Sequence, residues 1–292
     1  MHHHKTTRRA LLRRGVLVLG GAVASSLLAA DATRKPAVSL GLLTDLHYAD
    51  KPEAGSRFYR ETADKLTEAV TAFNREKLAS VVCLGDFIDQ AQSVDEEIAW
   101  LQRVEKVFAR AKAPRHYVLG NHCVGTLTKA EFAAHTAANR SPHYSFDLGR
   151  THFIVLDACY RHDGQAYGRK NFDWTDSNIP PQELEWLRGD LAKTTLPTVV
   201  FVHQRLDDAA KHSVRNAAEV RAELERNENV LAVFQGHSHR NDYQQIAGIH
   251  YCTLVAMVEG SGAGNNGYAV MEIMDDSSIR VRGFRRQQER QF

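Results

Sequence analysis

The chain has 292 residues, of which 43% are hydrophobic and 25% are charged, so it is long enough to bury a core without relying on disulfides. Its formal net charge is +2, but five of its 37 basic residues and only one of its 35 acidic residues lie in the first 32 positions. The rest of the chain therefore holds 32 basic against 34 acidic side chains, which argues against a broad nucleic-acid-binding surface.

The N-terminal segment, residues 1–32, is typical of a cleavable export signal. A basic stretch precedes an apolar run from Gly15 to Ala30, and Ala30-Asp31-Ala32 suits cleavage after Ala32. The run is shorter than the roughly 20 apolar residues of a membrane span. Thr7-Arg8-Arg9-Ala10-Leu11-Leu12-Arg13 resembles a twin-arginine signal, which export machinery reads as an address.

These features predict a periplasmic or extracellular protein whose mature domain, residues 33–292, has no stable membrane span. The twin-arginine export machinery is the expected partner during export. An uncleaved amphipathic leader, or an added tag at His2–His4, is the alternative interpretation of this segment.

The first predicted elements after the leader alternate between strands and helices. Apolar runs predict strands, and apolar residues that recur every three or four positions predict helices. In order these are a strand at Val38–Thr44, a helix at Ser56–Lys77, a strand at Ser80–Leu84, a helix at Glu96–Arg110 and a strand at Arg115–Leu119. Such alternation predicts parallel βαβ units, whose ligands collect at the carboxyl ends of the strands.

The later part of the chain begins with a predicted hairpin, His143–Leu148 and His152–Asp157, around a turn at Gly149-Arg150. The polar segment Arg161–Asn178 has no clear period, and loops of this length are usually functional or disordered. The remaining predictions are helices at Pro181–Leu191 and Val214–Arg226, and strands at Thr198–Val202, Leu231–Gln235, Asp242–Ile246, His250–Val255, Tyr268–Ile273 and Ile279–Phe284.

Five polar clusters each follow an apolar, strand-like run. They are Thr44-Asp45-Leu46-His47, Gly85-Asp86-Phe87-Ile88-Asp89, Gly120-Asn121-His122-Cys123, Val202-His203-Gln204 and Gly236-His237-Ser238-His239. Carboxylate and amide oxygens mixed with imidazole nitrogens suit divalent ions such as Mn²⁺, Fe or Zn²⁺. A single Asp or His at a strand end is more often a cap or turn residue, but five clusters in this order predict a metal site.

The spacing within the clusters supports the same prediction. The outer residues of Asp45–His47 and His237–His239 are two positions apart, so in an extended segment they would share a face and reach one metal or two neighbouring metals. Gly85, Gly120 and Gly236 each precede a candidate ligand and allow a sharp turn or a close backbone approach. The four cysteines form no CxxC pair, so a zinc ribbon is not indicated, and we expect Cys83 to be buried.

The ordered clusters resemble the motifs of the calcineurin-like binuclear metallophosphoesterases, which run DxH, GDxxD/N, GNHD/E, a lone His and GHxH. The resemblance covers nearly all of residues 33–292 and implies an α/β fold, a four-layer α/β/β/α sandwich with the site at its rim. It implies two divalent metal ions (Mn, Fe or Zn). One would be held by Asp45, His47 and His239, the other by Asn121, His203 and His237, with Asp86 between them.

The resemblance also implies a mechanism. Two cations would activate a shared water and clamp the phosphoryl oxygens, so no protein nucleophile would be required. His122 would be a catalytic residue beside the metals that stabilises the phosphoryl charge or protonates the leaving oxygen. Asp89 would orient a neighbouring ligand or loop rather than bind metal itself.

The sequence departs from the family pattern at two positions. Cys123 replaces the acidic residue after Gly-Asn-His, which we interpret as a tolerated change behind the metal ligands. His203 is followed by Gln204 and Arg205, so the usual proline is missing and a base is added. Purple acid phosphatases share the motif order, but Asp89 occupies the last position of the second motif and the metal-binding tyrosine of that group is absent.

A closer resemblance is to the manganese-dependent ADP-ribose/CDP-alcohol diphosphatases. The matching stretches are Asp45–Asp50, Arg57-Phe58-Tyr59-Arg60, Leu84–Asp89, Val155–Ala158 and Val258-Glu259-Gly260. The resemblance implies cleavage of the pyrophosphate bond of a nucleoside diphosphate derivative.

The basic aromatic run is the predicted substrate-binding segment. Arg57 and Arg60 would bind the second phosphate and Phe58 or Tyr59 would stack on a base, or else alternate members of the run pack the following helix. Arg205 would contact a substrate phosphate, or else it is a solvated surface residue.

The sequence therefore predicts an exported, metal-dependent hydrolase that cleaves a phosphodiester or pyrophosphate bond in a small phosphorylated substrate such as a nucleotide derivative. A phosphomonoesterase or a cyclic nucleotide phosphodiesterase is the alternative within the same class. The alternative from another class is a non-catalytic protein that binds a phosphoryl ligand, which only Cys123 and Gln204 favour.

Overall fold

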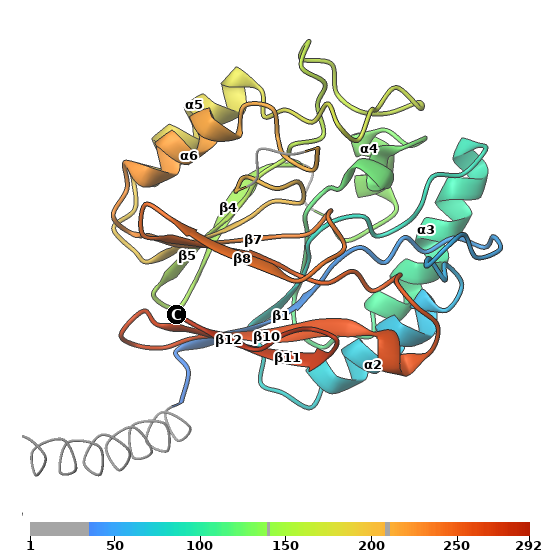
Figure 1. The fold of residues 1–292 in the computed structure, drawn as a ribbon, viewed down its shortest axis with the longest axis horizontal. Helices are drawn as coiled ribbons and strands as arrows, with labels where there is room; N and C mark the ends of the chain where they lie inside the picture. Colours follow the sequence, from blue (N-terminus) through green and yellow to red (C-terminus); the bar gives the residue numbers. More distant parts are fainter. Residues whose placement is uncertain (1–34, 139–140, 208–210) are drawn as a thin grey trace, which may run out of the picture. The chain divides into compact units, whose positions relative to one another are not determined.

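Two six-stranded sheets lie face to face, and helices cover the outer face of each sheet (Figure 1). The structure, a computed structural model, describes residues 35–138, 141–207 and 211–292. The predicted export signal at residues 1–32 lies outside the described residues. Ala37–Phe292 cluster as one unit by their contacts. The predicted four-layer α/β/β/α sandwich is confirmed.

The first sheet has the strand order β12-β11-β10-β1-β2-β3, of which β1, β2 and β3 are mutually parallel. Its strands are β1 (Val38–Leu43), β2 (Ser80–Cys83), β3 (Arg115–Tyr117), β10 (Gly267–Ile273), β11 (Ile279–Arg285) and β12 (Arg290–Gln291). Two helices, α2 (Thr62–Phe73) and α3 (Val94–Phe108), connect the parallel strands and cover the outer face.

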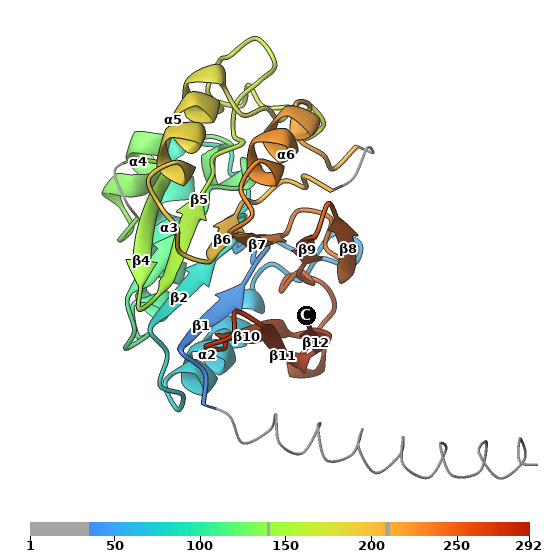
Figure 2. The same ribbon diagram turned by 90° about the vertical axis from the view of Figure 1, so that its left-hand side faces the viewer.

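The second sheet has the order β4-β5-β6-β7-β9-β8 (Figure 2). Its strands are β4 (Tyr144–Leu148), β5 (Thr151–Val155), β6 (Thr198–Phe201), β7 (Val230–Gln235), β8 (Asp242–Ile246) and β9 (Ile249–Thr253). Helices α5 (Pro181–Leu191) and α6 (Ala217–Glu225) cover its outer face. The hairpin predicted around Gly149-Arg150 is confirmed as β4 and β5.

Alternating side chains build the three cores of this sandwich. In β1, Leu40 and Leu42 lie between the sheets with Phe201 of β6 and Phe234 of β7. Val200, which precedes Phe201 in β6, faces α5 and α6 instead. Successive side chains of a strand point to opposite faces, so each apolar strand supplies two cores at once.

The structure corrects some element predictions. The helix predicted at Ser56–Lys77 begins only at Thr62. The residues before it are not helical, because the backbone of Arg57 forms isolated β-bridges with Ala54 and Glu259. A short helix, α4 (Lys129–Ala134), and two 3₁₀ turns, η1 (Asn121–Val124) and η2 (Ala263–Asn265), were not predicted. Within residues 35–138, 141–207 and 211–292, none of the helices has the length and apolar content to cross a bilayer.

Candidate metal centre

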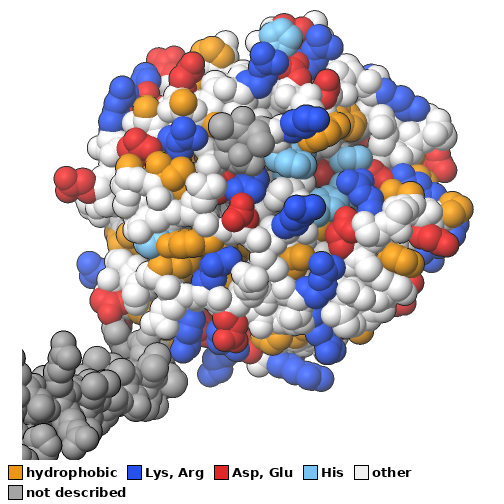
Figure 3. Space-filling view, viewed as in Figure 1, with side chains coloured by type: hydrophobic (Ala, Val, Ile, Leu, Met, Phe, Trp, Pro, Cys, Tyr) orange, Lys and Arg blue, Asp and Glu red, His pale blue; other side chains and the backbone are white. Residues whose placement is uncertain are grey.

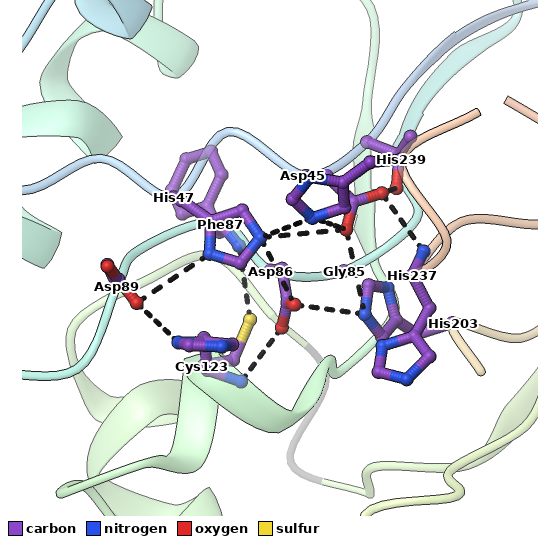
Figure 4. Close-up of polar contacts among 12 residues, drawn as sticks. Asp45, His47, Gly85, Asp86, Phe87, Asp89, Cys123, His203, His237 and His239 are labelled. Carbon is purple, nitrogen blue, oxygen red and sulfur yellow. Dashed lines mark hydrogen bonds and ion pairs between the residues drawn. The ribbon is translucent and has the colours of Figure 1, made fainter. Parts of the chain in front are cut away.

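The five predicted clusters meet where strands of both sheets end (Figure 4). Asp45 and His47 follow β1, Asp86 follows β2, and Asn121 opens η1 after β3. From the second sheet, His203 follows β6, and His237 and His239 follow β7. Side chains separated by up to 194 positions thus converge because both sheets point their strand ends to the same rim.

The first group of candidate ligands is Asp45, His47 and His239, whose ligand atoms all lie within 4.8 Å of one another. The Oδ1 atom of Asp45 lies 3.4 Å from Nε2 of His239 and 3.7 Å from Nε2 of His47. The two histidine Nε2 atoms are 3.1 Å apart. These three residues face one another as ligands of a single ion would.

The second group is Asp86, His203 and His237, again within 4.8 Å. Asp86 faces both groups, because its Oδ2 atom lies 3.1 Å from Nε2 of His203 and 3.4 Å from Nε2 of His47. Asn121 is 1% exposed and lines the same cavity as Asp86 and His237. The structure therefore brings together all seven residues that the sequence nominates as ligands.

Several buried atoms of these residues have no hydrogen-bond partner among the described residues. They are Oδ1 of Asp45, both amide atoms of Asn121, and Nε2 of His237. Buried polar atoms are almost always paired in folded proteins, so a cluster of unpaired buried oxygen and nitrogen atoms indicates a missing partner. Divalent cations suit this mixture of carboxylate, amide and imidazole ligands.

The backbone at the centre is strained in a repeated way. Asp45, His47, Asp86, His237 and His239 all have positive φ, between 45° and 68°. The prediction that Asp45 and His47 lie close together is therefore confirmed, but the segment that carries them is not extended as the prediction assumed. His237 and His239 enter different groups. Non-glycine residues in this conformation concentrate at functional sites, where surrounding structure holds the strain.

Two glycines leave room for the ligands. A Cβ atom on Gly120 would lie 2.2 Å from Oδ1 of Asp86, and one on Gly236 would lie 2.6 Å from Oδ2 of Asp45. These distances are below van der Waals contact, so the close approach that the sequence predicted is a steric requirement at both positions.

The charges of the centre support one another. Burial by itself would raise the pKa of Asp45, but His203 and His239 lower it below its usual value. Burial would likewise lower the pKa of His47, but Asp86 and Asp45 raise it to about 9. Burial and then the neighbouring His203 lower the pKa of His237 to about 3, so this imidazole is neutral and can act as a ligand.

Groups behind the ligands fix their orientation. Nδ1 of His203 donates to the Leu84 carbonyl oxygen at 2.8 Å, and Nδ1 of His239 lies 2.6 Å from Oε1 of Glu259. Lys65 is buried and its Nζ donates to the carbonyl oxygens of Met257, Glu259 and Gly260. Sequence reasoning gave Glu259 no role, although Val258-Glu259-Gly260 was one of the matching stretches.

His122 has a charged partner despite the cysteine that follows it. Its Nδ1 is in close contact with a carboxylate oxygen of Asp89, which also lies 3.7 Å from Nδ1 of His47. Lys51 Nζ holds the other oxygen of Asp89 at 2.5 Å. Burial raises the pKa of the Cys123 thiol to about 12, so it is neutral, and its Sγ accepts from the Phe87 N–H at 3.3 Å. Asp89 supplies the charge that residue 123 lacks.

The predicted substrate-binding side chains lie in different surroundings. Arg57 lines the cavity that contains the candidate ligands. Tyr59 is 5% exposed and packs in the core under α2. For this residue the alternative interpretation, packing against the following helix, is therefore correct, and stacking on a substrate base is excluded. Arg60 is paired with Asp50 at 2.6 Å.

Arg205 is neither a solvated surface residue nor a free cation. It is 5% exposed in the wall of the cavity beside the ligands, and its guanidinium pairs with Asp207 at 2.9 Å and with Asp242 at 2.7 Å. Its charge is therefore compensated before any substrate arrives, and its contact with a phosphate stays a prediction.

The cavity continues beyond the predicted residues. A hollow of about 280 Å³ holds His47, Asp86, Asn121, His122 and His239 together with Trp174 and His212. A second hollow of about 630 Å³ shares Arg57, His237 and His239 with it and adds Arg240 and Arg286. Figure 3 shows histidines gathered on this face with lysine and arginine side chains around them. No motif marked Trp174, His212, Arg240 or Arg286 in the sequence.

Comparisons with known proteins agree with this architecture. The sequence pattern of the family described as calcineurin-like phosphoesterase matches residues 38–241. The chain is 25% identical to a manganese-dependent ADP-ribose/CDP-alcohol diphosphatase of Oryza sativa subsp. japonica, over 85% of this chain and 92% of that protein. It is 24% identical to a probable cyclic nucleotide phosphodiesterase of Fibrobacter succinogenes, over 70% of this chain and 74% of that protein.

A crystal structure of a dimetal phosphatase from Danio rerio has the same fold. Its TM-score with this chain is 0.77 at 20% sequence identity, and the match covers 88% of this chain and 99% of that one. The family match spans more than half of the chain and includes all five clusters. The chain therefore belongs to the calcineurin-like phosphoesterase family and is a metal-dependent phosphoester hydrolase.

Proposed function

We propose that this enzyme cleaves the pyrophosphate bond of a nucleoside diphosphate derivative at a centre of two divalent cations. The observation that carries the proposal is the pair of adjacent three-residue groups with Asp86 facing both. Asp45, His47 and His239 would hold one cation, and Asn121, His203 and His237 the other, with Asp86 between them. Mn, Fe and Zn ions all suit these ligands. When bound, such cations would act as Lewis acids that polarise the phosphoryl group and activate water.

The remaining residues perform three tasks. Glu259 and the Leu84 carbonyl orient His239 and His203, so these imidazoles present Nε2 to the centre. His122, held by Asp89, lies beside the centre and can donate a proton to the leaving oxygen. Arg57 adds a fixed positive charge to the cavity wall, where a second phosphate would bind.

The choice of a pyrophosphate substrate is supported by two facts. The Oryza sativa relative is named for cleavage of ADP-ribose and CDP-alcohols, and the alignment covers 92% of that protein. The second hollow beside the centre has room for a second phosphate and is lined by Arg57, Arg240 and Arg286. Guanidinium groups bind phosphate oxygens in a bidentate manner.

Cyclic nucleotide phosphodiesterase activity is the second candidate, because the Fibrobacter succinogenes relative carries that name. A substrate screen with Mn²⁺-reconstituted protein separates the two. We expect ADP-ribose to be cleaved with a higher kcat/KM than 3′,5′-cyclic AMP and p-nitrophenyl phosphate. A higher kcat/KM for 3′,5′-cyclic AMP than for ADP-ribose would reject the diphosphatase proposal in favour of the second candidate, and a preference for p-nitrophenyl phosphate would reject both.

Asp86→Asn tests the centre itself. Removal of a group that faces both cation sites should lower kcat by more than the roughly 100-fold seen when only a supporting residue is lost. Activity towards bis(p-nitrophenyl) phosphate and manganese content per chain are the measurements. A variant that keeps wild-type turnover contradicts the two-cation proposal. Wild-type protein that binds ADP-ribose but turns over no phosphoester would instead support the non-catalytic alternative.

We also propose that the enzyme is exported by the twin-arginine pathway and acts outside the cytoplasm as residues 33–292. The support is the basic, apolar and small-residue order of residues 1–32. Replacement of Arg8 and Arg9 by lysine should retain the protein inside the cell at its full length. Export of this variant at the wild-type level would contradict the proposed pathway.

A further inference from the structure

Trp174 is the one large hydrophobic side chain that is exposed among the residues the structure describes, at 41%. It lies in the segment 161–178 between β5 and α5, which the sequence predicted to be an irregular loop. A single exposed apolar residue is unremarkable on a protein surface. Trp174, however, lines the cavity that contains His47, Asp86 and Asn121. The position of Trp174 in this cavity, rather than its exposure, therefore points to a role in binding a ligand.

The indole ring lies directly beside the candidate ligands. Its centroid is 6.2 Å from the ring of His237 and 5.2 Å from the ring of His212, which is tilted by 35°. His212 in turn lies 5.4 Å from His237 in an edge-to-face arrangement. The three rings form a continuous aromatic wall, so a group attached to a phosphoryl at the centre would lie within reach of the indole.

The backbone on both sides of Trp174 is anchored. The Asp173 carboxylate accepts hydrogen bonds from the Thr175 N–H at 2.9 Å and from the Thr175 hydroxyl at 2.7 Å. The Tyr167 hydroxyl donates to the Asp173 carbonyl oxygen at 3.0 Å. Asp176 pairs with Arg215 at 3.0 Å. An exposed ring on an anchored segment pays little ordering entropy when a ligand covers it.

The same cavity therefore offers two chemistries. His122 and Arg57 are polar or charged and suit a phosphoryl group, whereas Trp174 offers an aromatic face. Tyr59, one of the two aromatic residues that the sequence nominated for stacking, is buried and cannot take this role. Nucleobases stack on exposed aromatic side chains because every base has a π-face.

We infer that Trp174 is the platform on which the nucleobase of the substrate stacks, with His212 packed against the indole as its support. The inference rests on the proposed function, because it deepens the choice of a nucleotide substrate. It assigns the preference for a base-bearing diphosphate to a residue outside the metal-binding clusters. Trp174 is a specificity residue that contacts substrate, and its loss should leave the reacting centre intact.

The test compares two diphosphates, ADP-ribose and an analogue in which the diphosphate joins two ribose units and no base is present. Stacking on an aromatic side chain accounts for roughly a 5- to 150-fold effect per base. Trp174→Ala should lower kcat/KM for ADP-ribose by a factor in this range and change kcat/KM for the base-free analogue by less than about threefold. Trp174→Phe should retain most of the activity towards ADP-ribose. An equal loss for both substrates, or no loss for either, overturns the inference.

A binding measurement keeps this inference separate from the proposed function. The chain has three tryptophans, Trp100, Trp174 and Trp186, so AMP stacked on Trp174 should quench its fluorescence. Quenching should persist in Trp186→Phe, the matched control, and disappear in Trp174→Phe. If wild-type protein cleaves bis(p-nitrophenyl) phosphate but not ADP-ribose, the diphosphatase proposal fails. The AMP titration still tests whether a base stacks on Trp174. Quenching that does not depend on Trp174 would overturn this inference.

Discussion

Carboxylates and carbonyls behind the candidate ligands set how each imidazole is presented. His239 is the best example, because Glu259 holds its Nδ1 atom and so leaves Nε2 to face Asp45 and His47. The His239 imidazole and then burial move the pKa of Glu259 in opposite directions, and the imidazole prevails and lowers that pKa to about 2. Glu259 is therefore ionised at neutral pH and makes a charge-assisted contact.

Glu259→Gln should weaken metal binding without removing a ligand. Loss of a carboxylate that orients a metal-bound histidine typically lowers metal affinity by roughly 10- to 100-fold. A Mn²⁺ titration by isothermal calorimetry measures the change. Glu228→Gln, at an exposed position in the turn before β7, is the matched control and should bind as the wild type does. Unchanged affinity in Glu259→Gln would show that this carboxylate does not orient His239.

At the scale of elements, the strand-end turns matter more than the strands. The turns after β1, β2 and β7 place ligands in a left-handed conformation, and the backbones of Gly120 and Gly236 lie against side chains of neighbouring turns. Gly236 after β7 touches the turn after β1, and Gly120 after β3 touches the turn after β2. Gly236 therefore lets turns of the two sheets approach each other at the rim, and Gly120 does the same for two turns of the first sheet.

Gly236→Ala should damage the centre while the fold remains. The added Cβ would lie 2.2 Å from Oγ1 of Thr44 and 2.6 Å from Oδ2 of Asp45, so the turn after β1 must move. We expect at least a tenfold loss of Mn²⁺ affinity, by analogy with the loss of supporting contacts. Gly189→Ala is the control, because a Cβ there meets nothing within 4 Å. Gly189 lies within α5, so alanine should stabilise the protein by roughly 0.5–1 kcal/mol. Equal metal affinity in the two variants would refute the steric argument.

For the molecule as a whole, the unpaired ligands predict that metal binding stabilises the fold. Both sheets and the segment 257–260 contribute to the centre, so unfolding must release any bound cation. A ligand present at 100 times its Kd stabilises the folded state by about 2.7 kcal/mol. For a domain of this size, that corresponds to a rise in Tm of roughly 5 to 10 °C.

Differential scanning calorimetry of EDTA-treated protein before and after addition of Mn²⁺ measures this rise. The Asp86→Asn variant should show a smaller rise because it lacks the group between the two cation sites. An identical Tm with and without Mn²⁺ in the wild type would contradict the proposed coupling between metal binding and folding.

The sequence by itself determined the fold class, the order of most elements and the seven candidate ligands. Apolar periodicity depends on local geometry, so Pro181–Leu191 and Asp242–Ile246 were predicted with the bounds that the structure has. The ligand motifs are short and contiguous, so they can be recognised before their partners are known. Cys83 was likewise predicted to be buried from its apolar neighbours, and it is.

Only the tertiary structure decided what surrounds those ligands. The pairing of Asp89 with His122, the support of His239 by Glu259, and the pairing of Arg205 with Asp242 depend on the packing of segments apart in sequence. Tyr59 and Trp174 show the same division: a basic aromatic run nominated the buried tyrosine, while no pattern marked the exposed tryptophan. Periodicity reports which side chains an element buries, but the side chains that share a cavity are set by how the two sheets meet.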